Sequence, residues 1–480
     1  MPLRAKLNNA ALAGQANMST NAEIPKELPE DEADDVLFNS LYGVRTIELN
    51  RPKKLNSLNG SMARKIVPRL KEWEKSQMAN IILMSGAGSK AFCAGGDVAA
   101  LAKQNEEGPE GQKKSTDYFG LEYKLDHLIA TYSKPYIAIL DGITMGGGVG
   151  LSVHAPFRIA TERTLFAMPE TTIGFFPDVG GSFFLPRLDG EIGTYLALTS
   201  DRLSGVQAFY SGIATHYLDS SVLGNLTHRL SELVFKDYST LPERLDLVNK
   251  TISEFSTGLP QENIRLASNL RSAIDRSFKH NTLPEILSAL ESESTSATNT
   301  PKTKEWARKT LESLNSRSPT SLMVTLRQLR LGANWSIAET FQREHQIASH
   351  FMAHPDFVEG VSAKLVSKPP RQPTWTPASH TSLSESDIDK FFTIPAGQTR
   401  LPLIGGGNDY KTYPHERFAL PAEGYVERFV RDTAKSKREV IAHFVETWGG
   451  KEGVREKVRE VLDRKTVETE GGLRWVEEED

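Results

Sequence analysis

Two glycine-dense loops carry the clearest signal for chemistry in this sequence of 480 residues. The first, AFCAGGD, spans residues 91–97, and the second, GITMGGGVGL, spans residues 142–151; each follows a short apolar run. Four glycines in the five positions 146–150 lose conformational entropy on folding, so we expect them to serve something other than stability. A backbone N–H group at the end of a strand or the start of a helix can donate to an oxyanion. The two loops therefore predict two backbone donors to one oxygen, and two tight turns are the structural alternative.

A third segment, MPETTIGFFPDVGG at residues 168–181, places two carboxyl groups among apolar residues. Glu170 and Asp178 are separated by a turn-rich stretch that contains Phe175 and Phe176, which favour burial. A carboxyl group in apolar surroundings has its charged form disfavoured and can act as a base near neutral pH. The segment therefore predicts acid or base chemistry, and structural capping or pairing of the two acids is the alternative.

The spacing of other reactive side chains excludes several chemistries. No Gly-x-Ser-x-Gly motif occurs, which argues against a serine-triad thioesterase. The segment GAGSK at residues 86–90 lacks the spacing of a phosphate loop. Cys93 is the single cysteine and no CxxC or HExxH pattern occurs, so we expect a packed thiol and no structural zinc. No metal site and no redox cofactor is predicted.

Composition and charge limit the partners of the chain. Lys and Arg total 57 against 61 for Asp and Glu, a net charge of −4, so no global positive field would attract nucleic acid or an anionic membrane. No apolar run reaches the ~18 residues that a membrane span needs. The length predicts about three domains or subdomains, with no membrane partner and no direct nucleic-acid motif.

The elements that must position these residues alternate between strands and helices in the first half of the chain. Alternation at residues 44–49 and an apolar run at 80–85 predict strands, and apolar residues at helical spacing within 62–73 predict a helix between them. The same order returns with a helix at 116–132 and a strand at 136–140. This alternation favours an α/β fold.

Helical periodicity takes over after about residue 189. The serine- and threonine-rich run at 292–300 predicts a surface loop within this helical half. Helices are predicted at residues 225–235, 264–274, 318–331 and 337–351.

The last part of the chain differs in composition from the rest. PPRQP at 369–373 and GGG at 405–407 bracket an extended connector. Amphipathic helices are predicted at 425–432 and 436–448, and the alternating charges at 452–463 predict a solvated surface. We therefore expect the tail to be an appendage to the first core.

Taken in this order, the three segments resemble the enoyl-CoA hydratase/isomerase (crotonase) superfamily, and more closely its 3-hydroxyisobutyryl-CoA hydrolase branch. The resemblance runs from about residue 36 to about residue 377. It implies an α/β fold in which a crotonase-like spiral of ββα units is followed by a helical region and a C-terminal helical extension. Further matching segments are LNRPKKLNSL at 49–58, LPRL at 185–188, SPTSL at 318–322 and DFVEGV at 356–361.

Composition and resemblance together divide the chain into five segments. They are a disordered leader at 1–35, a crotonase-like catalytic core at 36–235, a helical C-terminal part of the hydrolase at 236–368, a Pro/Gly-rich connector at 369–412 and a helical extension at 413–480.

The start of the leader leaves two interpretations open. Residues 1–22 contain Arg4 and Lys6 and no acid, which fits either a weak mitochondrial transit peptide or an ordinary disordered tail. The resemblance to mitochondrial members of the family implies a mitochondrial location.

The resemblance also implies roles for individual residues. The family's two glycine loops form an oxyanion hole for a thioester carbonyl, which carries over to the backbone N–H groups of Gly96 and Gly147. Glu170 matches the catalytic glutamate, Asp178 the substrate-orienting aspartate and Glu122 a substrate-binding position.

One departure from the hydratases bears on the reaction. Hydratases carry a second catalytic glutamate just after the triple glycine, where this chain has Gly150, and they have glycine where this chain has Asp178. Both differences match the hydrolase pattern and argue against hydration of a double bond.

The resemblance therefore implies hydrolysis of 3-hydroxyisobutyryl-CoA to 3-hydroxyisobutyrate and CoA, a step of valine breakdown. Coenzyme A is part of this substrate, and no separate cofactor is implied. A long C-terminal extension resembles fungal members that are built into the small subunit of the mitochondrial ribosome, so an assembly role, with or without retained activity, is the alternative. Enoyl-CoA hydration or isomerisation is a second alternative. The acyl preference, the oligomeric state and the choice between attack by Glu170 itself and attack by water stay open.

Overall fold

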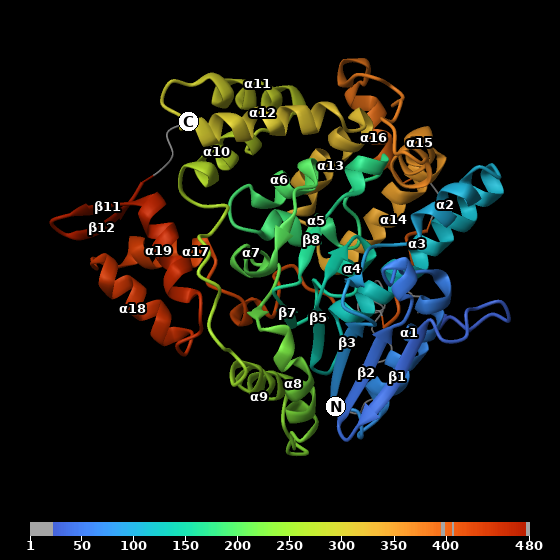
Figure 1. Cartoon of the computed structure of the whole chain (residues 1–480), viewed down its shortest axis with the longest axis horizontal. Coiled ribbons are helices and arrows are strands. Elements are labelled where there is room, and N and C mark those ends of the chain that lie inside the picture. The colour runs from blue at the N-terminus through green and yellow to red at the C-terminus, as the bar shows by residue number, and fades with distance from the viewer. Residues whose placement is uncertain (1–22, 395–398, 406–407, 477–480) are drawn as a thin grey trace, which may run out of the picture.

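The largest sheet of the protein has six strands. The computed structural model describes residues 23–394, 399–405 and 408–476. Only β1 and β2 pair in antiparallel fashion, and every later neighbour in this sheet is parallel (Figure 1). The spatial order is β1 (Val36–Leu41), β2 (Val44–Leu49), β3 (Ile81–Gly86), β5 (Tyr136–Leu140), β7 (Phe157–Ala160) and β10 (His216–Tyr217).

A second, four-stranded sheet repeats the path of the first. After each of β3, β5 and β7 the chain enters the small sheet and then a helical segment, which gives the ββα repeat that the family resemblance predicts. Its strands are β4 (Ala91–Cys93), β6 (Ile143–Met145), β8 (Leu165–Ala167) and β9 (Leu203–Ser204). The turns that leave β4, β6 and β8 hold the two glycine loops and Glu170, so the repeat brings the three predicted segments to one edge.

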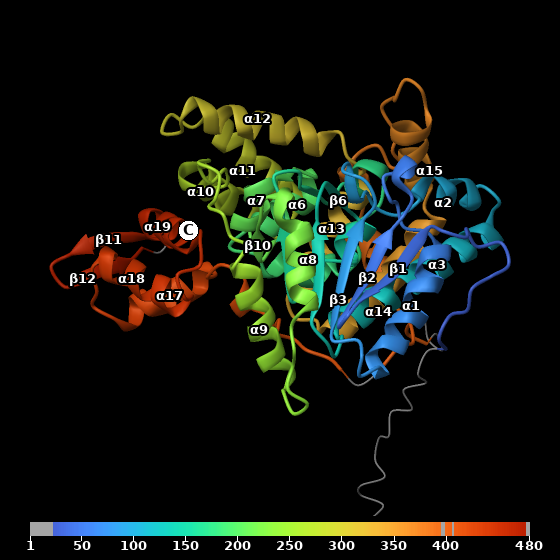
Figure 2. The ribbon, with the colours of Figure 1, turned by 60° about the horizontal axis from the view of Figure 1, so that its bottom comes forward.

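Both faces of the large sheet are covered by helices. Every residue of β5 is buried, as expected for a central parallel strand. One face packs on α1 (Gly60–Lys75) and α3 (Pro109–Ala130) through Met84 and Ala138, and the other packs on α8 (Leu223–Ser231) and α9 (Leu241–Ser253) through Leu83 and Ile137 (Figure 2). Helix α1 begins at Asn59, whose side chain accepts a hydrogen bond of 2.9 Å from Met62 N–H.

The second half of the core is helical, as predicted. The run at 292–300 is only partly a loop, because α11 continues to Thr295. The helices of this half are α10 (Ser268–Phe278), α11 (Leu283–Thr295), α12 (Pro301–Asn315), α13 (Pro319–Gly332), α14 (Ile337–Ala353) and α15 (Pro355–Val361). Shorter helices precede them in the chain: α2 (Val98–Asn105), α4 (Gly147–Gly150), α5 (Gly181–Phe184), α6 (Ile192–Thr199) and α7 (Gly205–Tyr210). None of the helices in the described ranges is long and apolar enough to cross a membrane.

The segment at 369–412, expected as an extended connector, contains a helix. Helix α16 (Glu385–Phe392) begins at Ser384, whose hydroxyl accepts from Asp387 N–H in a capping box. Ile388 and Phe391 are buried against the main core, so this part of the connector is packed and not free.

The C-terminal extension is joined to the core and is not a separate appendage. Its helices are α17 (Glu423–Asp432), α18 (Lys437–Thr447) and α19 (Val454–Lys465), and it ends in a hairpin of β11 (Thr466–Thr469) and β12 (Gly472–Trp475) that the purely helical prediction lacked (Figure 1). Val458 and Val461 of α19 are fully buried, so the charged stretch at 452–463 has one apolar face inside the protein.

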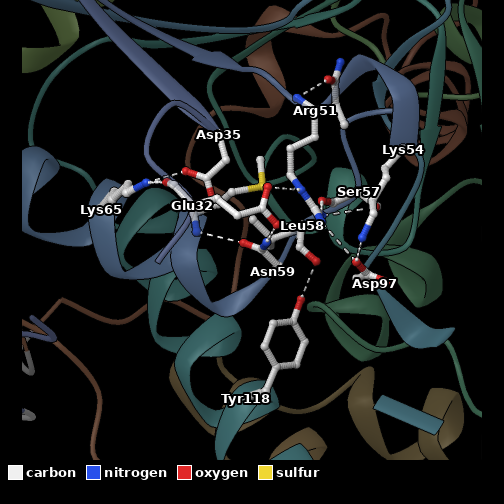
Figure 3. Close-up of polar contacts among 12 residues, drawn as sticks. Glu32, Asp35, Arg51, Lys54, Ser57, Leu58, Asn59, Lys65, Asp97 and Tyr118 are labelled. Carbon is white, nitrogen blue, oxygen red and sulfur yellow. Dashed lines mark hydrogen bonds and ion pairs between the residues drawn. The ribbon is translucent and has the colours of Figure 1, made fainter. Parts of the chain in front are cut away.

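The predicted disordered leader is too long at its C-terminal end. Residues 1–22 lie outside the described part of the chain, so the transit-peptide interpretation is not addressed. By contrast, Asp31 pairs with Arg64. Glu32 pairs with Arg51, and Asp35 accepts from Lys65 at 2.6 Å (Figure 3). These acids are held because cations of α1 and of the turn after β2 face them.

Candidate active site

The first glycine loop leaves one backbone N–H group pointing away from its strand partner. After β4, Leu58 and Gly96 form a parallel bridge in which Leu58 N–H donates to Gly95 O at 2.8 Å and Asp97 N–H donates to Leu58 O at 2.9 Å. In such a bridge the hydrogen bonds to Leu58 are made by the residues before and after Gly96, so the N–H of Gly96 itself points away from Leu58. Gly95 has φ +105°, which only glycine adopts without strain.

The second glycine loop brings another N–H group to the same place. Gly146, with φ +45°, turns the chain from β6 into α4, so Gly147 is the first helical residue and its N–H has no acceptor within the helix. A β-carbon built on Gly147 would lie 3.5 Å from the backbone nitrogen of Gly96 and would collide with Glu122 Oε1. The backbone nitrogens of Gly96 and Gly147 thus border one small space, which Glu122 Oε1 also reaches.

Glu170 faces this space from the turn that follows β8. It starts a short 3₁₀ helix (Glu170–Ile173), and its side chain is buried. A β-carbon built on Gly146 would lie 3.2 Å from Glu170 Oε1, while Glu170 Oε2 is buried without a hydrogen-bond partner in the described part of the chain. Burial, and next the charge of Asp178, raise the pKa of Glu170 well above its usual value.

Asp178 is buried in a turn that is fixed from two sides. Tyr123 of α3 donates its hydroxyl to Asp178 Oδ2 at 2.7 Å. Glu344 of α14 accepts from Gly180 N–H at 2.7 Å and from Ser182 N–H at 2.9 Å, which holds the residues that follow Asp178. Burial raises the pKa of Asp178 to about 7, and the hydrogen bond from Tyr123 limits the rise.

Two buried acids of this region were not predicted from the sequence. Asp126 follows Glu122 by one helical turn on α3, and Glu344 lies on the buried face of α14. The sequence did contain a signal for Asp126: it follows Glu122 by four residues, and this spacing places both acids on the same face of a helix. We use the term carboxyl cluster for Glu122, Asp126, Glu170, Asp178 and Glu344, none of which takes part in an ion pair within the described ranges.

A cavity of about 560 Å³ opens beside Gly96, within the range of small-molecule sites. Tyr118 lines this cavity and donates its hydroxyl to Leu58 O at 3.1 Å (Figure 3). The same hydroxyl would lie 3.2 Å from a β-carbon on Gly96, so Tyr118 stands between Gly96 and the cavity. Cationic and acidic side chains both line the cavity, and Asp97 accepts hydrogen bonds from Lys54 at 3.1 Å and Arg51 at 3.2 Å. The lining includes Glu32, Arg51, Lys54, Arg64, Lys114 and Tyr118.

Other reactive groups near the loops do not join this arrangement. The Cys93 thiol is buried and donates weakly to Gly95 O at 3.6 Å, and burial raises its pKa to about 12, which fits the predicted packed thiol. No group of three or more His, Cys, Asp or Glu residues in the described ranges is arranged to hold a metal ion.

Comparison with known proteins agrees with this architecture. The enoyl-CoA hydratase/isomerase family model matches residues 44–392. A Neurospora crassa protein named small ribosomal subunit protein mS47 is 56% identical over 100% of this chain and 94% of its own length. A Gallus gallus protein named mitochondrial 3-hydroxyisobutyryl-CoA hydrolase is 43% identical over 78% of this chain and 92% of its own length.

Solved structures show the same fold. A carnitinyl-CoA dehydratase from Mycobacterium thermoresistibile is 32% identical with a TM-score of 0.66, and covers 78% of this chain and 100% of its own. An enoyl-CoA hydratase from Rhodobacter sphaeroides is 30% identical with a TM-score of 0.64, and covers 76% of this chain and 99% of its own. With the family model, the relatives and the repeated ββα order in agreement, this chain belongs to the enoyl-CoA hydratase/isomerase (crotonase) family.

Proposed function

We propose that this protein hydrolyses 3-hydroxyisobutyryl-CoA in the mitochondrion. The observation that carries the proposal is the small space flanked by the N–H groups of Gly96 and Gly147 and bordered by Glu122, with Glu170 facing it from the turn after β8. The similarity to proteins named mitochondrial 3-hydroxyisobutyryl-CoA hydrolase supports this choice of thioester and of compartment.

In the proposed mechanism the thioester oxygen lies between the two N–H groups. Attack on the carbonyl carbon moves negative charge onto this oxygen, and the donors of Gly96 and Gly147 stabilise it. Loss of one such donor typically lowers the rate by ~10²–10³. Because the two donors belong to rigid backbone, little reorganisation is needed as the charge develops.

Glu170 supplies the nucleophile or activates it. If its carboxylate attacks, a mixed anhydride forms, the carbon–sulfur bond breaks, and the CoA thiolate takes a proton before water hydrolyses the anhydride. If Glu170 instead removes a proton from water, the hydroxide attacks the carbonyl carbon, the carbon–sulfur bond breaks, and the CoA thiolate takes the proton back from Glu170 as the acid product forms. Glu122 and Asp178 bind the acyl part, with Asp178 accepting a hydrogen bond from the 3-hydroxyl group.

The cavity beside Gly96 would hold the remainder of the substrate. Its exposed Lys54 and Lys114 side chains suit the phosphate groups of coenzyme A. No further cofactor enters this mechanism, because carbonyl attack and thiolate departure need only the groups named above.

An acyl-CoA panel with the purified full chain tests this proposal. We expect 3-hydroxyisobutyryl-CoA to be the best substrate and Glu170→Gln to lower turnover by at least ~10²–10⁴ while the circular dichroism spectrum is unchanged. Label found in Glu170 after a single turnover in H₂¹⁸O identifies the anhydride route, since water must then have attacked the Glu170 carbonyl carbon of the anhydride. A folded protein that hydrolyses no acyl-CoA, or an active Glu170→Gln variant, would overturn the proposal.

A second proposed function is a role in the small subunit of the mitochondrial ribosome. The observation that favours it is that the relative named mS47 matches 100% of this chain, including the extension that lies outside the family model ending at residue 392. Co-sedimentation of the native protein with that subunit in a sucrose gradient is the test. Migration of all the protein at the position of a free chain would contradict this role without affecting the hydrolase proposal.

A further inference from the structure

A second cavity, of about 640 Å³, lies between the family core and the C-terminal extension, and we call it the seam cavity. Its volume is within the range of small-molecule sites. One wall is built by residues of β7, α5, α7 and the turn after α13, and the other by residues between 411 and 457, beyond the family match that ends at 392. The seam cavity shares no lining residue with the cavity beside Gly96 and none with the carboxyl cluster, so the mechanism above does not use it.

Two arginines line the seam cavity without an acid beside them. Neither Arg158 of β7 nor Arg187 after α5 has a carboxylate within ion-pair distance in the described ranges, although Arg158 is only 4% exposed. Aromatic rings face both cations instead: Cζ of Arg187 lies 3.7 Å from the centre of the Phe183 ring, and Cζ of Arg158 lies 5.5 Å from the centre of the Tyr413 ring. A buried charge without an opposite charge is costly, so these two cations favour an anion in the space that they line.

The two guanidinium groups hold the same short segment of the extension. Arg187 donates to Lys411 O at 3.0 Å, and Arg158 donates to the Tyr413 hydroxyl at 2.7 Å. The two cations therefore stand at neighbouring points of the wall. The Lys411 side chain, which belongs to the same segment, is exposed and has no ion pair in the described part of the chain.

Each arginine keeps one N–H group that donates to nothing within the described residues. Arg158 uses four of its five N–H groups, on the Tyr413 hydroxyl and on the main-chain oxygens of residues 155, 212 and 213, which leaves one at Nη2. Arg187 donates only from Nη1 and Nη2, to the main-chain oxygens of residues 183, 332, 333, 335 and 411, which leaves Nε–H. These two N–H groups and the Lys411 ammonium are donors that an acid group of a ligand can use.

The acids of the lining limit how much negative charge a ligand can carry. Lys457 pairs with Asp189 at 2.7 Å, so these two charges offset each other. Glu416 accepts from the Tyr425 hydroxyl at 2.7 Å and has no cation within ion-pair distance in the described ranges. A polyphosphate would be repelled by Glu416, whereas a single acid group can lie beside the arginines.

The remaining surface of the seam cavity is largely aromatic and apolar. Rings come from both walls, and the lining includes Phe183, Phe184, Tyr210, Tyr413, Tyr425 and Trp448. Such a surface suits a ligand whose body is itself apolar and contains a ring.

We propose that the seam cavity binds a small organic acid, whose single acid group lies beside Arg158, Arg187 and Lys411 and whose ring-containing apolar body packs against the aromatic walls. This site goes beyond the proposed hydrolase function and does not depend on it.

Fluorescence titration of the full chain with 1-anilinonaphthalene-8-sulfonate tests the proposal, because this probe joins one acid group to aromatic rings. We expect saturable binding at one site per chain. N-phenyl-1-naphthylamine has the same rings without the sulfonate and should bind at least ten-fold more weakly, since it loses a charge-assisted contact. Equal affinity for the two probes would overturn the proposal.

Variants of the cavity wall locate the site. Ala422→Trp fills the seam cavity and should abolish saturable binding while the circular dichroism spectrum is unchanged. Thr412→Trp, at an exposed position of the same lining, serves if the first variant does not fold. Undiminished binding of the sulfonate probe in a folded tryptophan variant would overturn the proposal.

The charge of the wall is tested separately. Lys411→Gln should weaken the sulfonate probe about two- to five-fold and leave the neutral probe unchanged. Lys250→Gln is the matched control, because it removes an exposed lysine of α9 that does not line the cavity. An equal effect of both variants on the sulfonate probe would contradict the assigned contact.

A competition experiment separates the seam cavity from the candidate active site. Excess coenzyme A should leave the probe bound, because the cavity proposed for coenzyme A shares no residue with this one. Displacement of the probe by coenzyme A, or absence of saturable binding in the wild type, would overturn the proposal. The binding titrations use no hydrolysis, so failure of the hydrolase proposal does not affect their result.

Discussion

At the scale of single residues, this site is defined by carboxyl groups that have been removed from water without a cation. Asp178 has one hydroxyl donor and a pKa raised by burial to about 7, and Glu170 is buried with one oxygen unpartnered in the described ranges. Ionised acids in such surroundings are held only where a substrate group or a shared proton compensates for the lost hydration. The individual acids should therefore differ in what they do for the substrate.

We predict that Asp178 selects hydroxyacyl over plain acyl thioesters. Asp178→Ala should lower kcat/KM for 3-hydroxyisobutyryl-CoA at least ten-fold more than for isobutyryl-CoA. The reason is that a site built to pair a hydroxyl group discriminates strongly against an analogue that lacks it, whereas an apolar pocket separates one methylene by only ~1–3 kcal/mol. Steady-state kinetics on the two substrates gives the ratio. Equal losses on both substrates would assign Asp178 to the common chemical step or to structure.

We predict that Gly150 is required because Asp126 occupies its side-chain space. Gly150→Glu should destabilise the protein by about 1–3 kcal/mol or more through overpacking, and should show at most weak hydration of an enoyl-CoA. Urea unfolding measures the loss. The matched double variant Gly150→Ala with Asp126→Ala should lose less stability than the sum of the two single losses, because it relieves the contact with Asp126 while the contact with Val179 stays. Strictly additive losses would contradict the contact with Asp126.

At the scale of elements, the site depends on where strands of the small sheet end. β4 and β6 are parallel neighbours, so the loops that leave them, with Gly96 and Gly147, emerge at the same edge. Helix α3 crosses this edge and adds Glu122, while α14 packs on α3 and fixes the Asp178 turn through Glu344. A small change in one loop should therefore affect chemistry more than folding.

We predict that Gly147→Ala separates activity from stability. The added methyl group would collide with Glu122 Oε1 beside the N–H of Gly96, so turnover should fall by at least ~10² while the protein remains folded. Gly224→Ala in α8 is the matched control, because a β-carbon there meets no atom within 4 Å. It should keep full activity and gain up to ~1 kcal/mol of stability, and comparable activity of both variants would contradict the proposed oxyanion site.

At the scale of the whole molecule, the extension and the family core form one folded body. Lys457 of α19 pairs with Asp189 at 2.7 Å, and Arg464, also of α19, pairs with Glu423 at 2.6 Å. Arg271 of α10 contacts the same Glu423 at 3.1 Å, so a buried ionic network crosses the boundary between the two parts. Because apolar residues of both parts also lie in one cluster, we expect a single cooperative unfolding transition.

We predict that removing Arg464 destabilises the entire chain. Arg464→Ala removes the ion-pair partner of Glu460 and leaves Glu423 with Arg271 alone, which should cost about 1–3 kcal/mol and lower the midpoint of one shared transition. Arg455→Ala on the exposed side of α19 is the control and should change stability by no more than about 0.5 kcal/mol. Two separate transitions in calorimetry would show that the extension unfolds independently.

The sequence by itself determined the fold class, the two glycine loops and the pair Glu170 and Asp178. Those features depend on local spacing: apolar alternation marks the strands, and glycine clusters mark the turns that follow them. The roles assigned to Gly96, Gly147 and Glu122 remain predictions that rest on the family resemblance.

Only the tertiary structure decided which charged residues are inside. Asp126 lies on a helix that also carries exposed charges, Glu344 lies on a helix whose other acid and arginine are half-buried, and Lys457 stands in a stretch that alternates charge. Helical spacing places such residues on a face, but burial depends on which element packs over that face, and this contact joins residues distant in the chain. For the same reason the packed α16, the C-terminal hairpin and the anchored acids at 31–35 could not be read from local composition.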